Sequence, residues 1–192
     1  LKEWSIKSSI ILENQLIHLE SSGSQNTANG SATLEGYGDL DFIVSLSDST
    51  FVAEIESSKI NIQGNILNNL DASITGNMAF DSCSLNMSSS QLNIKANLNP
   101  IEFASTNFIS SGFTQIKDPN FLSQIIDHSI NTGPNTTIEW KILSDESKVD
   151  FSSDFISSNG IRLSNVSFSG DPVNLNGIAT CEELMILTNG KT

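Results

Sequence analysis

The chain has 192 residues, of which 38% are hydrophobic and 16% are charged, and its formal net charge is −13. This acidity excludes a nucleic-acid partner, because binding phosphates needs a basic surface. It also disfavours peripheral binding to anionic lipid headgroups. The length suits one domain, which we expect to be all-β and to span residues 1–192.

The first 30 residues predict a hairpin followed by a loop. Trp4 and Ile6 alternate with polar residues, Glu13-Asn14 suits a tight turn, and the return strand reaches about residue 22. Residues 21–30 hold no large apolar side chain, and we interpret them as a flexible loop.

Residues 31–98 carry the strongest pattern in the chain. Apolar residues occupy every second position in short bursts, of which Leu40, Phe42, Val44 and Leu46 form one. The bursts recur about every 9–11 residues and are separated by polar, Gly-, Ser- and Asn-containing turns, a spacing typical of antiparallel sheets. Alternation with period two indicates strands with one dry face and one wet face.

Residues 103–132 break this pattern. A Phe-rich stretch is followed by apolar residues at helical spacing, with Asp118 as an N-cap, Pro119 at the first helical position and Gly133-Pro134 as the stop. We therefore expect one helix near residues 118–132, packed on the dry face of the sheet.

Alternation returns after residue 134, and Asn159-Gly160 is a strong type I′ turn signal. The predicted fold is mainly β: a curved or twisted antiparallel sheet of about twelve to fourteen strands with the helix on its dry face. A β-sandwich is the alternative.

Residues capable of chemistry are few. His18 and His128 are the only histidines, and each is interpreted as a structural or surface residue. The acidic pairs Asp39/Asp41 and Glu54/Glu56 fall on the wet phase of their strands, where charges are expected. No metal-binding, phosphate-binding or nucleophile motif occurs. We predict no catalytic residue, no metal, no cofactor and no enzymatic activity.

The two cysteines, Cys83 and Cys181, leave two readings open. They could form a disulfide in an oxidising compartment, which would constrain the unfolded chain by roughly 4–5 kcal/mol. They could equally be two buried thiols that act as small hydrophobic groups. No stretch of about 18 apolar residues occurs, so we expect no transmembrane helix in this chain.

Two phrases carry a resemblance to a known family. They are Ile60-Asn61-Ile62-Gln63-Gly64-Asn65 and Ile161-Arg162-Leu163-Ser164-Asn165-Val166-Ser167-Phe168-Ser169-Gly170. Their alternating texture, which ends on glycine, resembles bacterial envelope proteins of the AsmA/TamB-like type. The resemblance implies a curved periplasmic sheet that is dry on its concave side, with a role in lipid movement or outer-membrane assembly. It also implies that the chain, which begins at Leu1, belongs to a longer envelope protein.

Our first functional hypothesis is a non-enzymatic periplasmic or envelope protein whose apolar sheet face binds lipid or another hydrophobic ligand, or takes part in envelope assembly with another envelope protein. The candidate ligand-binding residues are Phe42, Val44, Phe51, Ile55, Phe103, Phe108, Phe113, Phe121 and Ile125. The competing interpretation is that this face is a core sealed by the helix. The alternative function is a secreted or cell-surface interaction module, such as an adhesin-like β-structure.

Overall fold

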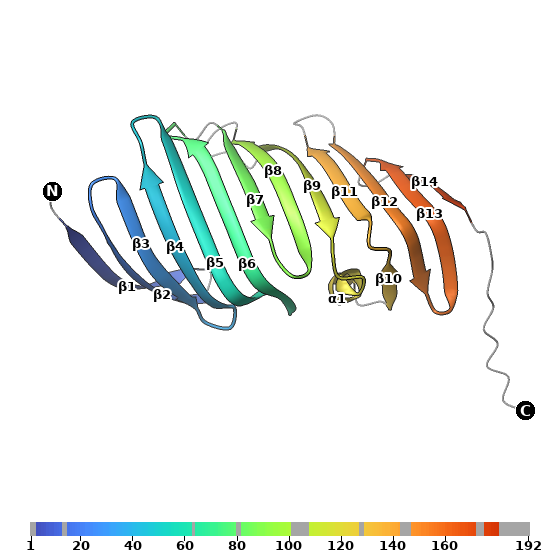
Figure 1. Ribbon diagram of the computed structural model, residues 1–192, viewed down its shortest axis with the longest axis horizontal. Helices are drawn as coiled ribbons and strands as arrows, with labels where there is room; N and C mark the ends of the chain where they lie inside the picture. Colours follow the sequence, from blue (N-terminus) through green and yellow to red (C-terminus); the bar gives the residue numbers. More distant parts are fainter. Residues whose placement is uncertain are drawn as a thin grey trace, which may run out of the picture.

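The computed structural model describes residues 3–12, 15–62, 64–79, 82–100, 108–126, 129–142, 147–171 and 175–180. These residues form one open antiparallel sheet of 14 strands, with a short helix between β9 and β10 beside the strand ends near the middle of the sheet (Figure 1). The prediction of a curved antiparallel sheet with one helix is confirmed. The alternative of a β-sandwich is wrong, because the strands pair into one continuous sheet rather than two packed ones.

The strands follow one another in sequence order across most of the sheet. Each pairs with the next, except that β9 pairs with β11, and β10 pairs with β12 beside the main path. The elements are β1 (Trp4–Leu12), β2 (Gln15–Gly23), β3 (Thr27–Leu34), β4 (Gly38–Leu46), β5 (Thr50–Ile62), β6 (Asn65–Asn77), β7 (Cys83–Ser88), β8 (Leu92–Pro100), β9 (Phe108–Ile116), α1 (Phe121–Ile126), β10 (Ile130–Thr132), β11 (Thr136–Ile142), β12 (Ser147–Ser158), β13 (Ile161–Gly170) and β14 (Leu175–Thr180).

The register confirms the first hairpin, because Leu12 pairs with Gln15, while the predicted turn residues Glu13-Asn14 lie outside the described residues. The second predicted turn is confirmed directly. Ser158 pairs with Ile161 across Asn159-Gly160, whose positive φ angles of 50° and 81° are those of a type I′ turn. The predicted loop at residues 21–30 is wrong, because β2 runs to Gly23 and β3 begins at Thr27.

Strand pairing sorts the side chains onto two faces, since directly opposed residues in an antiparallel pair share a face. We call the apolar one the groove face. One row of opposed residues crosses it on every strand of the main path: Ile6, Ser21, Gly30, Phe42, Ile55, Ala72, Met87, Ile94, Thr114, Ile138, Phe151, Phe168 and Gly177.

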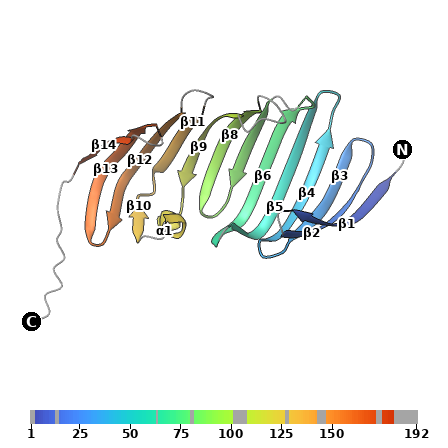
Figure 2. The ribbon, with the colours of Figure 1, turned by 180° about the vertical axis from the view of Figure 1, so that it is seen from behind.

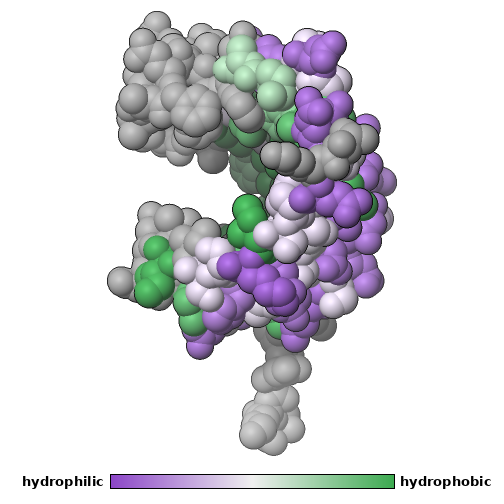
Figure 3. All heavy atoms as spheres, turned by 90° about the vertical axis from the view of Figure 1, so that its left-hand side faces the viewer, coloured by the Kyte–Doolittle hydropathy of each residue, from purple (hydrophilic) through white to green (hydrophobic). Residues whose placement is uncertain are grey.

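The opposite, outer face is polar. Its corresponding row is Lys7, Glu20, Ser31, Asp41, Glu56, Asp71, Ser88, Asn93, Gln115, Thr137, Ser152, Ser167 and Ile178. Seen along its long axis, the sheet has the cross-section of an open C, with hydrophobic residues within the hollow and hydrophilic residues over the outer surface (Figure 3). Viewed from behind, the strands lie side by side along the length of the molecule (Figure 2).

Two long hairpins, β5–β6 and β12–β13, are built in the same way. In each, the strand ladder skips one pair at an asparagine with positive φ, Asn69 at 53° and Asn165 at 49°. Each hairpin also has a left-handed glycine at its tip, Gly64 or Gly160, and the members of the second hairpin lie 96 residues after their counterparts.

The skipped pair changes the phase of alternation within the strand. Leu67 and Leu70, on either side of Asn69, are both buried although they are three positions apart. The buried Ser57 of β5 donates to the Asp39 carbonyl (2.6 Å) beside this point. A left-handed residue therefore keeps both ends of a long strand on the groove face, where strict alternation would turn one end outward.

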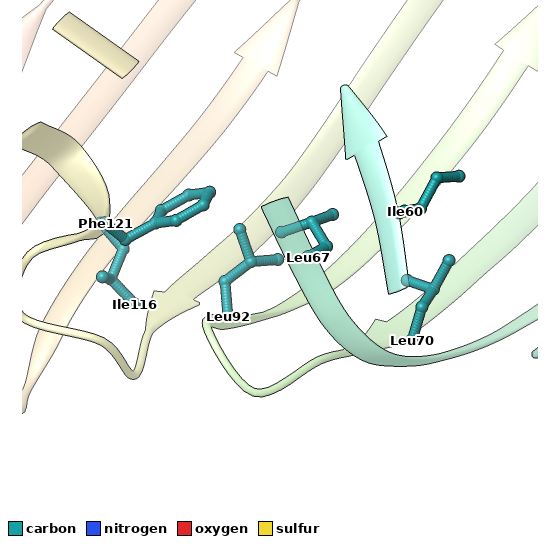
Figure 4. Packing of buried hydrophobic residues seen from close by; sticks show 6 residues of the cluster. All are labelled: Ile60, Leu67, Leu70, Leu92, Ile116 and Phe121. Carbon is teal, nitrogen blue, oxygen red and sulfur yellow. The ribbon is translucent and has the colours of Figure 1, made fainter. Parts of the chain in front are cut away.

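The best-packed part of the groove lies along one rim of the sheet, at the strand ends near α1. Ile60, Leu67, Leu70, Leu92, Ile116 and Phe121 form its buried cluster (Figure 4). The helix spans Phe121–Ile126, much less than the predicted 118–132, and Ile130–Thr132 is a strand instead. Asp118 caps the turn that leads into it, since its carboxylate accepts a hydrogen bond from the Asn120 N–H (2.9 Å).

Five glycines of the groove face lie beneath aromatic rings of neighbouring strands. Trp4 covers Gly23, Phe42 covers Gly30, Phe51 covers Gly76, Trp140 covers Gly112 and Phe168 covers Gly177. A Cβ atom at Gly76 would lie 2.6 Å from the Phe51 ring, and one at Gly112 would lie 2.6 Å from Cη2 of Trp140. The missing side chain lets each ring approach the neighbouring backbone closely.

The first prediction concerns this arrangement. Gly112→Ala should destabilise the protein by about 1–3 kcal/mol, because the new methyl group displaces the Trp140 ring and crowds the Lys95 carbonyl, 2.7 Å away. Urea unfolding followed by tryptophan fluorescence measures the effect. In a Trp140→Leu background the same substitution should cost less. An equal cost in both backgrounds would contradict a role for the ring.

The second prediction concerns the left-handed asparagines. Asn165→Val should lower the free energy of unfolding by about 1–2 kcal/mol, because a β-branched residue is strained at positive φ. Asn165→Gly should change it by less than about 0.5 kcal/mol. Chemical denaturation of both variants decides, and a valine that is tolerated as well as glycine would disprove the need for this conformation.

Candidate ligand-binding groove

The floor of the groove is apolar from one edge of the sheet to the other. The row from Ile6 to Gly177 contains no charged residue on any of its strands. A parallel row runs from Trp4 through Val44, Ile74 and Trp140, and it is equally uncharged. Because neighbouring strands lie about 4.8 Å apart, thirteen strands give the floor a length of about 58 Å.

Most of this floor is not sealed. The buried hydrophobic residues of the described chain lie on β5, β6, β8, β9, α1 and β13, and six of them form the cluster that includes Phe121 of α1: Ile60, Leu67, Leu70, Ala72, Leu92, Ala96, Ile116, Phe121 and Val166. Elsewhere on the groove face the large side chains are only half-buried, and Ile6 is 52% exposed. Within the described part of the chain, α1 is the only helix, and it packs against the strand ends near the middle of the sheet.

Four of the predicted ligand-binding residues lie on the groove face, as expected. Phe42 pairs with Ile55, and Val44 and Phe51 follow at positions of the same phase on β4 and β5. All four are half-buried. They lie side by side in the half of the groove formed by the first strands.

The Phe-rich segment behaves differently. Phe121 is buried in the cluster beside Ile116, whereas Ile125, on the same short helix, is 51% exposed. Phe113 lies on the outer face, where it is opposed by Lys95 and Glu139, so its assignment to the groove is corrected. Phe103 and the side chain of Phe108 lie outside the described residues.

Several aromatic residues of the groove were missing from the predicted set. Trp4, Trp140, Phe151 and Phe168 all lie on the groove face. The period-two pattern of residues 138–151 could have identified Trp140 and Phe151. Both indole N–H groups are bonded, Trp4 to the Ser24 carbonyl and Trp140 to the Ser110 hydroxyl, each at 3.1 Å. The two rings are thus fixed in orientation at distant points of the floor.

The outer face concentrates the charge. Asp41, Glu56 and Asp71 lie directly opposite one another on β4, β5 and β6. A hollow of about 580 Å³ extends from there across the first strands and is also lined by Lys7, Glu20 and Glu54. Lys7 pairs with Glu20 at 2.7 Å. The carboxylates therefore point away from the groove, as the alternation predicted for both acidic pairs.

A second ion pair lies farther along the outer face. Lys148 contacts Asp150 at 2.8 Å. The hydrogen bond from Lys148, and then one from Ser169, holds the pKa of Asp150 below its ordinary value, and the same contact raises the pKa of Lys148. Both groups are exposed to water, so this pair is a surface interaction of small energetic weight.

Groups with metal-binding or catalytic potential are sparse in the described residues. No three His, Cys, Asp or Glu side chains of this part of the chain group closely enough to hold a metal ion. His18 accepts or donates a 2.9 Å hydrogen bond with Ser9 in the β1–β2 hairpin. Cys83 in β7 is a half-buried free thiol, which contradicts the predicted disulfide with Cys181 and agrees with the alternative of free thiols. His128 and Cys181 themselves lie outside the described residues.

Comparison with protein-family models, with curated proteins and with solved structures found no match. Of the helices in the described residues, none has the length and apolar character needed to cross a membrane. Functional inference therefore depends on the geometry of the two sheet faces.

The third prediction concerns the acidic row. Glu56→Gln should raise the free energy of unfolding by about 0.2–1 kcal/mol at low salt, because it removes a charge that directly opposes Asp41 and Asp71. The gain should shrink at high salt, where exposed charges are screened. Denaturation at two salt concentrations measures it, with Glu139→Gln near Lys148 as the control. A loss of stability at low salt would refute repulsion in this row.

Proposed function

We propose that this protein is a non-enzymatic lipid-binding protein whose groove face holds acyl chains. One observation carries the proposal: an uncharged, apolar floor crosses thirteen strands and is left half-exposed by the described residues. Soluble proteins rarely expose a continuous apolar surface of this extent unless something binds it.

The energetics favour a hydrocarbon ligand. Each methylene group removed from water contributes about 0.8 kcal/mol. Half-exposed floor residues such as Ile6 lose additional apolar area to water when a chain lies on them. A chain of ordinary length can therefore offset the entropic cost of association through contacts with the floor alone.

The shape of the groove favours extended ligands over compact ones. Its floor is about 58 Å long, whereas one leaflet of a bilayer has a hydrocarbon thickness of only about 15 Å. Several acyl chains could lie along it, end to end or side by side. The charged residues project from the outer face, so binding should depend on the hydrocarbon chain and be tolerant of the headgroup.

The envelope assignment is part of this proposal. The alternating texture of residues 60–65 and 161–170 resembles AsmA/TamB-like proteins of the bacterial periplasm, and an apolar concave sheet is the property that this resemblance implies. We place the protein in the periplasm or cell envelope, with lipid as its ligand and another envelope protein as its partner.

The fourth prediction tests the ligand. The chain contains two tryptophans, Trp4 and Trp140, and both belong to the groove floor. A bromine-labelled fatty acid should quench their fluorescence saturably, because the bromine atoms approach the rings when the chain occupies the groove. Solvent extraction of the purified protein followed by mass spectrometry should recover co-purified lipid.

A matched pair of variants locates the binding surface. Ile55→Asn on the groove face should weaken fatty-acid binding about tenfold, since a polar group is buried under the chain. Ile43→Asn, at a 50% exposed isoleucine on the outer face, should leave it unchanged. No quenching by the labelled acid, or equal losses in both variants, would contradict the proposal. Circular dichroism confirms that each variant is folded.

A further inference from the structure

The sheet contains a repeated unit of three strands. The strands β4, β5 and β6 pair with one another in the same register as β11, β12 and β13 (Figure 1). Every residue pair of the second unit has its counterpart 96 positions earlier in the first. The likeness of the two long hairpins therefore extends to a third strand in each unit.

The two units also bend at the same place. The left-handed residues Asn69 and Asn165 hold equivalent positions. Each lies next to a strand pair that contains a buried serine, Ser57 in the first unit and Ser153 in the second. Because the residue left out of the ladder sets the local bend of a strand, the two units curve about the groove in the same way.

Each unit contributes matching positions to the apolar floor of the groove. In one row, the residues of the first unit are Phe42, Ile55 and Ala72. Those of the second unit are Ile138, Phe151 and Phe168. Ala72 is buried and the other side chains of this row are half-buried. The repeat therefore places two similar, partly exposed apolar surfaces on one floor.

We propose that the groove holds two separate acyl ligands, one on each three-strand unit. This inference rests on the proposed lipid-binding function and adds the stoichiometry and the positions of the two subsites. The central strands of the units, β5 and β12, are six strand spacings apart, which is about 29 Å. A hydrocarbon chain of leaflet length, about 15 Å, covers about three strands and is too short to occupy both centres.

The stretch of floor between the units is the part most engaged by the helix. Its residues Met87 and Ile94 pack against the buried cluster that contains Phe121 of α1. Of the floor residues compared above, all of which are described, Ile138 alone packs against this cluster. The cluster therefore occupies the middle of the floor more than the units on either side, which favours two subsites over one continuous site.

The fifth prediction is a stoichiometry of two. Native mass spectrometry of the delipidated full chain, titrated with dibromostearic acid, should show two molecules bound at saturation. Saturation at one molecule, or a series that extends beyond two, would overturn the two-subsite proposal while leaving lipid binding intact. A chain that binds none of the acid would overturn both this proposal and the proposed function.

Matched variants assign each ligand to its unit. Ile55→Asn and Phe151→Asn change equivalent positions, and each should weaken binding about tenfold in its own subsite only. Single tryptophans report the subsites separately. Trp4→Phe leaves Trp140 as the reporter of the second unit, and adding Trp140→Phe with Phe42→Trp moves the reporter to the first.

Quenching by the brominated acid should respond to Phe151→Asn when the reporter lies in the second unit and to Ile55→Asn when it lies in the first. Circular dichroism confirms that each variant is folded. Loss of both signals through either substitution alone would show a single shared site and contradict the proposal. The stoichiometry of the unmodified chain tests the same point without any variant.

Discussion

The structure depends on an unbroken ladder of backbone hydrogen bonds from β1 to β14. A single-layer sheet has no second layer to pack against. Among the described residues, only nine hydrophobic side chains are buried to the degree typical of a protein core. Stability therefore comes from the pairing of each strand with two neighbours and from side chains that meet across those pairs. Every interior strand supplies backbone hydrogen-bond partners to the strands on both sides. The register of each strand is therefore the property that the sequence constrains most tightly.

The pairing of aromatic rings with glycines lets large apolar side chains lie on the groove face without filling the hollow above it. Trp140 lies over Gly112, where no side chain competes for the space, and its ring is fixed by the hydrogen bond that its N–H donates to Ser110. The ring covers the exposed backbone of the glycine and contributes apolar surface without obstructing the hollow. The same solution recurs at both ends of the sheet, at Gly23 and Gly177.

This pairing also explains where sequence reasoning failed. Period-two alternation identified Phe42, Val44 and Ile55 correctly, because their strands contain large residues at every second position. Residues 21–30 lack such residues, and their pattern therefore predicts a loop. Their groove-face positions include Gly23 and Gly30, which must be small because the rings of Trp4 and Phe42 occupy the space above them. The large apolar side chains that would identify this segment as a strand therefore lie on the neighbouring strands, β1 and β4.

The other differences between the predicted and the observed sheet arise where the alternation of inward and outward side chains is shifted by one residue. Phe113 was assigned to the groove by composition, but Gly112 beside it takes the groove position beneath Trp140, which places Phe113 outward. Similarly, Leu67 and Leu70 cannot both face one side of a regular strand. Only the left-handed Asn69 makes this compatible with burial, and asparagine is too common in this chain to signal it.

The short helix has the greatest consequence for function. The apolar spacing of residues 121–130 suits a helix, yet α1 ends at Ile126. The Ser123 hydroxyl accepts a hydrogen bond from the Ile130 N–H (2.8 Å) and donates one to the Ile130 carbonyl, which draws the chain back toward the sheet. Residues 130–132 then pair with β12, and the Thr132 N–H bonds the Pro119 carbonyl at 3.0 Å. A segment held in this way lies beside the strand ends near the middle of the sheet and does not extend along the floor (Figure 1). The described residues therefore leave the floor half-exposed, and the proposed ligand surface depends on this exposure.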